Sequence, residues 1–236
     1  MARQKWMPRF AKWHIWLGWL VGFPILMWLV TGLIMVSRPI EEVRGEHLRQ
    51  FVAEHALPSE TNVMVLLPEG NDRPVKSVTT EMNGGVAVTS LTYMDGTIER
   101  YDPAGALIRP IDEAAARAIV ASRIVGGRTI ESMTQFAASD VPFDFRRPIP
   151  VWQAKLSDGT HIYIAEQTGE IAAVRTRWWR LFDFMWGLHI MDLETREDTS
   201  HPILILFAAL GVIGALIGCI LMFRRRKARV VANNAS

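Results

Sequence analysis

Two long uncharged stretches lie near the two ends of this 236-residue chain. Trp13 to Ser37 contains 25 residues without Asp, Glu, Lys or Arg, and Pro202 to Phe223 contains 22. A helix needs roughly 20 apolar residues to cross the hydrocarbon core of a bilayer. Because core helices of soluble proteins seldom stay uncharged over this length, the pattern predicts two transmembrane helices, over residues 13–37 and 201–223.

The first stretch could also be a cleaved secretory signal, because the basic residues Arg3, Lys5, Arg9 and Lys12 precede it. Its apolar run, however, exceeds the roughly 7 to 15 residues typical of a signal peptide. The segment that follows, residues 35–39, offers no small-x-small cleavage site. We therefore expect an uncleaved membrane anchor.

Basic residues flank both predicted spans on the side of the chain termini. Four precede the first span in the lead 1–12, and five follow the second span in the tail 224–236. Lys and Arg next to a span resist translocation. The sequence therefore predicts a membrane protein with both termini in the cytoplasm and a central domain on the other side of the membrane.

The region between the spans alternates polar and apolar residues and contains two similar units. Residues 86–105 and 150–169 each read as a strand, an Asp-Gly hairpin, a second strand and a glycine-terminated turn. The Asp-Gly pair supplies the positive-φ positions of a tight primed hairpin turn. We expect two exported halves, residues 38–109 and residues 110–176.

A helix is expected ahead of the second unit, over residues 110–120. Asp112 is suitable as its N-cap, and Glu113 falls in its first turn. A strand over 129–135 and a polar loop follow. This order predicts an α+β fold in which one helix packs on an antiparallel meander, repeated twice. A further exported helix is expected over residues 45–55, with His47 and His55 on its solvated face.

The residue composition limits the kinds of site that this chain could contain. Cys219 is the single cysteine and lies in the second span, so no intrachain disulfide is possible. The net charge of +2 comes largely from the flanks of the spans, so it gives no reason to expect nucleic-acid binding. The sequence has no Cys-x-x-Cys, His-Glu-x-x-His, Rossmann or P-loop motif.

These features resemble a known family. The second exported unit resembles a PepSY domain in its strand 151–155, Asp158-Gly159 turn, strand 162–165 and turn 168–171. The apolar ends of the chain resemble PepSY-associated transmembrane proteins. This second resemblance rests on residues 13–18 and 31–34 and on Gly187-Leu188-His189 ahead of the second span. This chain has two spans where larger relatives have four, and Met191-Asp192 replaces an expected glycine.

The resemblance implies a location in the bacterial inner membrane with a periplasmic central domain. It also implies haem, because the family includes ferric-siderophore reductase-like proteins. The candidate axial ligands of a b-type haem are His14, His189 and His201, since neutral imidazole binds haem iron and ionisable groups at membrane depth are functional candidates. The alternative is that these histidines only contact headgroups and water. His189 belongs to an aromatic segment, residues 177–200, that is expected to lie in the membrane interface.

Geometry limits how these histidines can pair. Roughly 30 Å of bilayer separates His14 from His201, so one haem cannot bridge them. His189 and His201 could share a haem, whereas His14 would need a second copy of the chain or a second haem. Enclosing haem takes about four helices, which favours a homodimer. Small residues on both helices permit close packing. They are Gly18 and Gly22 on the predicted His14 face, Ala208, Gly211, Ala215 and Gly218 on the His201 face, and Gly214.

The leading hypothesis is therefore an electron-transferring membrane protein, a haem-dependent reductase component that acts on an exported acceptor such as a ferric siderophore or a periplasmic redox partner. Two rivals remain. One is a tethered PepSY binding module that restrains a peptidase, and the other is an accessory subunit of a larger complex.

Overall fold

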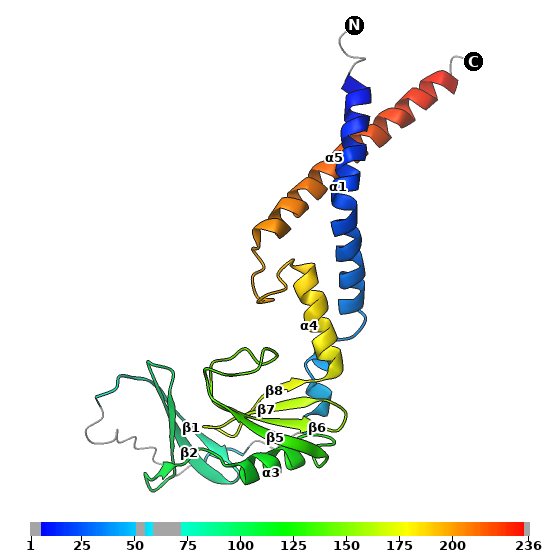
Figure 1. Cartoon of the computed structure of the whole chain (residues 1–236). Helices are drawn as coiled ribbons and strands as arrows, with labels where there is room; N and C mark the ends of the chain where they lie inside the picture. The colour runs from blue at the N-terminus through cyan, green and yellow to red at the C-terminus, as the bar shows by residue number, and fades with distance from the viewer. Residues whose placement is uncertain (1–5, 51–54, 59–71, 234–236) are drawn as a thin grey trace. The chain divides into compact units, whose positions relative to one another are not determined.

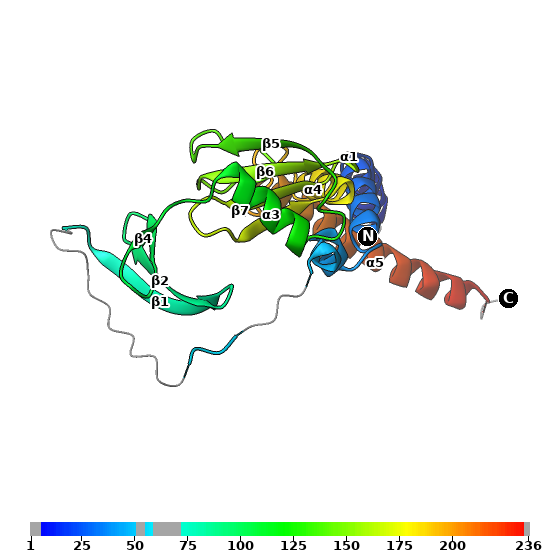
Figure 2. The ribbon, with the colours of Figure 1, turned by 90° about the horizontal axis from the view of Figure 1, so that it is seen from below.

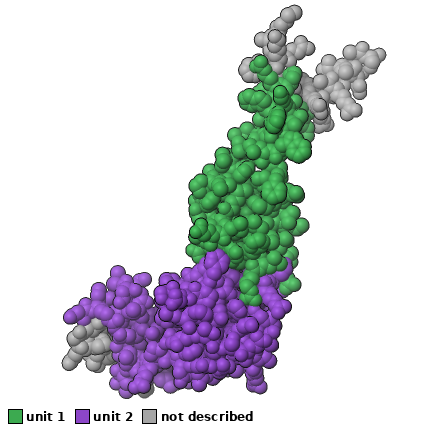
Figure 3. Space-filling model, viewed as in Figure 1, with its two compact units in different colours: residues 1–39, 180–236 green, residues 40–179 purple. Residues whose placement is uncertain are grey.

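The computed structural model describes residues 6–50, 55–58 and 72–233, with side chains from residue 8 to residue 223 within those ranges. The chain divides into two compact units, which Figure 3 shows in different colours. One is a helical unit made of residues 1–39 and 180–236. The other, residues 40–179, contains both β-sheets.

The helical unit contains α1 (Trp6–Met35), most of α4 (Arg177–His189) and α5 (Pro202–Asn233). Two described helices are long and apolar enough to span a membrane, Pro8–Met35 and Pro202–Phe223, as the sequence predicts. In Figure 1, α5 crosses α1. Much of the apolar surface of these helices faces outward, with Trp19 82% exposed, as lipid-facing side chains would be.

The second unit holds two four-stranded antiparallel sheets, each with its strands in sequence order. The first sheet contains β1 (Val75–Asn83), β2 (Val86–Tyr93), β3 (Ile98–Tyr101) and β4 (Leu107–Ile108). The second contains β5 (Ile130–Phe136), β6 (Val151–Leu156), β7 (His161–Ala165) and β8 (Ile171–Arg175). The predicted meanders are therefore present, and β1 is a strand that the sequence analysis missed.

The two Asp-Gly turns are built alike. Gly96 and Gly159 have φ of 85° and 80°, and the preceding aspartates accept 2.8 Å hydrogen bonds from the backbone N–H of Thr97 and Thr160. The expected primed turn is wrong in one respect. Only the glycine of each pair has positive φ, because the aspartate uses its side chain to close the turn from the ordinary side of the φ/ψ map.

The second sheet is covered on both faces. Helix α3 (Glu113–Arg123), capped by Asp112 through a 2.8 Å bond from Ala115 N, covers one face (Figure 2). Its Val120 packs with Ile162 and Ile164 of β7. The loop between β5 and β6 covers the other face, where Phe145 stacks on Tyr163 with ring centroids 4.7 Å apart.

The helix expected over residues 45–55 is not formed in the described part of that segment. Only the short helix α2 (Ile40–Val43) and the 3-10 turn η2 (Glu46–Leu48) are present, and Arg49 then forms a β-bridge with Ile124. Residues 51–54 lie outside the described residues. Among the residues described before β1, the first sheet therefore has no counterpart of α3, so the repeat lies in the sheets.

Candidate functional site

His189 ends α4 and is held by two residues of α1. Its carbonyl oxygen accepts a 2.8 Å hydrogen bond from the indole N–H of Trp28, and its Nδ1 lies 2.9 Å from Oγ1 of Thr31. Thr31 is 2% exposed. The imidazole of His189 is therefore fixed by contacts that begin about 160 residues earlier in the chain.

The Thr31 hydroxyl lies between this imidazole and the backbone of its own helix. Its Oγ1 lies 2.8 Å from the carbonyl oxygen of Met27 and 2.9 Å from Nδ1 of His189. Where the hydroxyl donates to Met27, its oxygen accepts from an N–H on Nδ1 of His189, and the lone pair of the ring then lies on Nε2. That is the tautomer in which Nε2 of a histidine ligates a metal.

His14 lies near the other end of α1, against α5. A Cβ atom added to Gly218 would come within 2.9 Å of Cε1 and 3.3 Å of Nε2 of His14, so only glycine leaves room for this ring. Nδ1 of His14 is buried and has no hydrogen-bond partner among the described residues. A buried polar atom in this state is unfavourable by about 1–3 kcal/mol unless something else satisfies it.

His201 immediately precedes α5, and its carbonyl oxygen accepts a 3.2 Å bond from Ile205 N. Its Nδ1 is also buried without a partner in the described part of the chain. His14 and His201 therefore both have an imidazole nitrogen shielded from solvent.

The three histidines do not form one cluster. His14 and Thr31 are 17 positions apart on α1, which places the His14 and His189 rings about 25 Å apart along the helix. The described residues contain no group of three or more His, Cys, Asp or Glu side chains able to hold a metal ion. Sharing of one haem by His189 and His201 stays a prediction.

The glycines lie differently from the prediction. Gly211, Gly214 and Gly218 of α5 face α1, where Gly214 lies against Leu17. A Cβ atom added to Gly18 or Gly22 would have no heavy atom within 4 Å, and these two glycines line an open groove with Trp19 and Phe23. His14 therefore packs on the α5 glycines, and the α1 glycine pair stays uncovered within the described protomer.

A buried ion pair fixes the loop after α4, and the sequence analysis, which assigned residues 177–200 to an interfacial aromatic segment, missed it. Arg196 Nη1 lies 2.5 Å from Asp183, which is 6% exposed, and Trp186 Nε1 donates to the Arg196 carbonyl at 3.1 Å. The Arg196 stem passes over Gly187, where a Cβ would lie 2.8 Å from its Cγ. These contacts secure the turn of helix that presents His189.

Asp192 closes the same loop. Its carboxylate accepts hydrogen bonds from the Thr195 hydroxyl and from the backbone N–H groups of Thr195, Glu197 and Asp198. These bonds, the Thr195 hydroxyl first, hold the pKa of Asp192 well below its usual range. The charged form of Asp192 is therefore the one that these hydrogen bonds stabilise.

His161 of β7 does not point to water as an ordinary strand-end histidine would. Its Nδ1 lies 3.1 Å from Oδ2 of Asp144, and Tyr163 donates to the other oxygen of the same carboxylate. Burial, with the bond to Asp144, raises the pKa of Tyr163. Asp144 comes from the loop between β5 and β6, so no local pattern in the sequence could indicate the pairing.

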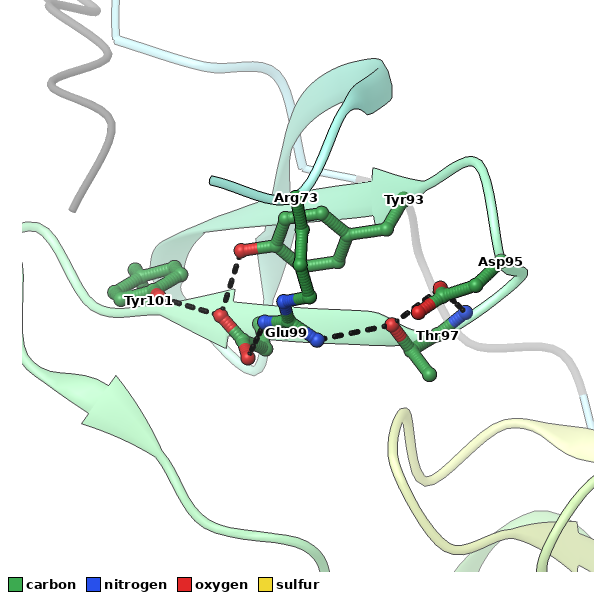
Figure 4. Close-up of polar contacts among 6 residues, drawn as sticks. All are labelled: Arg73, Tyr93, Asp95, Thr97, Glu99 and Tyr101. Carbon is green, nitrogen blue, oxygen red and sulfur yellow. Dashed lines mark hydrogen bonds and ion pairs between the residues drawn. The ribbon is translucent and has the colours of Figure 1, made fainter. Parts of the chain in front are cut away.

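Figure 4 shows a second polar cluster, on the first sheet. Glu99 accepts hydrogen bonds from Tyr93 at 2.8 Å and Tyr101 at 2.7 Å and pairs with Arg73. The Arg73 guanidinium also stacks over Tyr93, 3.8 Å from the ring centroid. These donors satisfy the carboxylate, so the cluster is built for stability and offers no open coordination position.

Comparison with known families gives one match. The family described as the PepSY-associated TM region matches residues 11–235, which is nearly the whole chain. Searches of curated proteins and of solved structures give no significant match. The match spans both apolar helices and both sheets, so this chain belongs to the PepSY-associated transmembrane region family and is a membrane protein.

Proposed function

We propose that this protein binds b-type haem in its helical unit and passes electrons across the membrane to an exported acceptor, such as the iron of a ferric siderophore. The observation that carries the proposal is the hydrogen bond between Nδ1 of His189 and Thr31. Because this bond occupies Nδ1, Nε2 is the nitrogen of the ring that would bind iron.

The residues present fit such a group. Nδ1 of His189 is hydrogen-bonded to Thr31, and His14 and His201 each hold a buried nitrogen that lacks a partner among the described residues. These three histidines would hold the haem, which supplies one-electron chemistry when bound. Thr31, itself buried, orients the imidazole of His189, and Trp28 fixes the end of α4.

The separation of the ligands along α1 supports transfer across the bilayer. His14 and His189 lie about 25 Å apart, close to the thickness of the hydrocarbon core. In the orientation that the basic flanks predict, His14 would lie on the cytoplasmic side and His189 on the periplasmic side. The two ends of α1 would thus serve electron entry and electron exit.

A homodimer completes the proposal. Each protomer supplies two long helices, and the groove at Gly18 and Gly22 is open within it. Small residues let two membrane helices approach closely, so this groove is the surface on which a second copy would pack. Four helices would then surround the histidines.

The test is absorbance spectroscopy of the protein purified from haem-replete cells. We expect a Soret band that shifts and sharpens on reduction with dithionite. His189→Ala should remove or strongly reduce the band from its site, because the ligand is lost. Thr31→Val should keep haem but shift its midpoint potential, because the imidazole loses the acceptor for its N–H.

His47→Ala is the matched control, since His47 lies in the second unit, and its spectrum should equal that of the wild type. A colourless wild-type protein that is folded and monodisperse would rule out the haem proposal. A spectrum unchanged in His14→Ala, His189→Ala and His201→Ala alike would rule out these ligands.

The second candidate is a tethered binding module, and the first sheet favours it. Strand β1 is nine residues long and, among the described strands, pairs only with β2. An open strand edge is a template onto which an extended segment of a partner such as a peptidase can add. Folded, colourless protein that binds such a partner would favour this function.

A further inference from the structure

The second unit contains a polar cavity that the haem proposal does not use. Its volume is about 460 Å³, within the range of small-molecule sites. It is lined by one face of the first sheet, by the turn between β7 and β8, and by the end of α3. It differs from a typical apolar pocket because hydroxyl and charged groups dominate its walls.

Strand alternation places these groups on one face. Thr79 of β1 pairs with Ser90 of β2, and Ser90 pairs with Arg100 of β3, so the three form a row across the sheet. Thr92 and Ile98 form the next row along the strands, and Glu81 lies two residues beyond Thr79. All of these residues line the cavity.

Arg100 is the most unusual member of the row. It is only 9% exposed, yet its Nη1 donates only to backbone carbonyls, of Thr168 at 3.0 Å and of Gln167 at 3.4 Å. No carboxylate among the described residues forms an ion pair with it. A buried guanidinium with neutral partners is an unfavourable arrangement that an incoming carboxylate would relieve.

The other charges of the cavity decide the kind of ligand. Arg123 at the end of α3 adds a second positive charge, and Glu81 and Glu170 add two negative ones. The cavity is therefore close to neutral, which disfavours a polyanion. From strand spacing, the backbones of Arg100 and Glu81 are about 12 Å apart, so their side chains can grip opposite ends of one small molecule.

We propose that this cavity binds a zwitterion of the size of a di- or tripeptide. Its carboxylate would pair with Arg100, supported by Arg123, and its ammonium group would pair with Glu81. The hydroxyls of Ser90 and Thr92 would hydrogen-bond the peptide groups between them. The site is independent of haem, because all of these residues belong to the second unit.

The test is calorimetric titration of the full-length protein in nanodiscs with trialanine. We expect saturable binding, weakened about tenfold to a hundredfold by amidating the peptide's C-terminus or acetylating its N-terminus. Arg123→Gln and Glu81→Gln should weaken binding similarly. Arg117→Gln, which alters an exposed arginine of the same helix outside the cavity, should not.

Several results would overturn the proposal. They are no binding up to about 10 mM trialanine, equal binding of the blocked and free peptides, and competition by inorganic phosphate as strong as by free trialanine. Arg100→Lys is a further variant, and if it fails to fold, the blocked peptides still decide because they need no mutation. The haem spectrum should stay unchanged throughout, which separates this test from the haem test.

Discussion

Single polar residues in this protein are satisfied both by near neighbours in the chain and by partners from distant parts of it. The Glu99 carboxylate receives the hydroxyls of Tyr93 and Tyr101, and the His189 imidazole meets Thr31 of another helix. The Tyr101 bond, followed by Tyr93 and Arg73, lowers the pKa of Glu99. A carboxyl whose pKa is lowered on folding stabilises the folded state only while it is ionised.

Glu99 therefore makes stability depend on acid pH. Its contribution should be complete above its unfolded pKa of about 4.3 and should vanish as the pH falls through its lower folded value. We expect Glu99→Gln to lower the melting temperature by a few degrees at pH 7 and much less at pH 3. Glu131→Gln removes an exposed carboxylate of β5 and should show no such pH dependence. Equal losses at both pH values would contradict the assignment.

At the scale of elements, the crossing of α1 and α5 depends on which residues of α5 are small. Gly214 packs against Leu17, and Gly218 lies so close to His14 that a Cβ atom added to Gly218 would clash with the imidazole ring. Gly211 faces Ile25 at an ordinary 3.9 Å. Glycines on one helix face are therefore not equivalent, and only the one beside His14 is tied to a candidate ligand.

Gly218→Ala should disturb this crossing. The added methyl must displace the His14 ring or separate the helices, at a cost of about 1–3 kcal/mol. We expect a lower melting temperature together with a changed spectrum of any haem held by His14. Gly211→Ala is the matched control on the same helix and should behave as the wild type. A normal spectrum and stability in Gly218→Ala would show that His14 is not confined there.

The elements themselves follow from local patterns. The length of the two stretches without charged residues predicts both long helices. Asp112 predicts the start of α3, and each Asp-Gly pair predicts a hairpin. Strand β1 is not predicted from the sequence, because VKSVTTEMN has polar residues on both faces of the strand and so does not alternate regularly between polar and apolar residues. The helix expected over 45–55 is not formed over the described residues 45–50, because Arg49 forms a β-bridge with Ile124, and this tertiary contact overrides the local helix preference.

The sites are less predictable than the elements. His14, His189 and His201 can be singled out because a titratable group beside an apolar span is rare. The residues that these histidines contact cannot be singled out from the sequence, because Thr31, Gly218 and Trp28 are of types that occur commonly in membrane helices. The pairing of His161 with Asp144 and the burial of Arg100 likewise arise only when separate elements fold together.

At the scale of the whole molecule, the described residues form two helices long enough to span a membrane, whereas a haem held between helices is usually enclosed by about four. The α5 glycines are used within the protomer, whereas Gly18 and Gly22 remain open. Close packing of small residues is a main source of affinity between membrane helices. The surface left free by folding is thus the one best suited to a second copy.

Gly22→Leu should convert the proposed dimer to a monomer, because the side chain fills the groove that the second helix would enter. Chemical cross-linking in membranes and light scattering in detergent would measure the change. Ala209→Leu adds the same bulk at an exposed position of α5 and should leave the dimer intact. A monomeric wild type would rule out the dimer, and a Gly22→Leu protein that still cross-links would place the interface elsewhere.

Cys219 gives this molecule a built-in reporter. It is the sole thiol of the chain, it is exposed, and it directly follows the glycine on which His14 packs. A nitroxide attached to the unaltered sequence would stand one residue from the meeting point of the two long helices. Pulsed electron resonance between two such labels would then give a distance across a symmetric pair without engineering the chain.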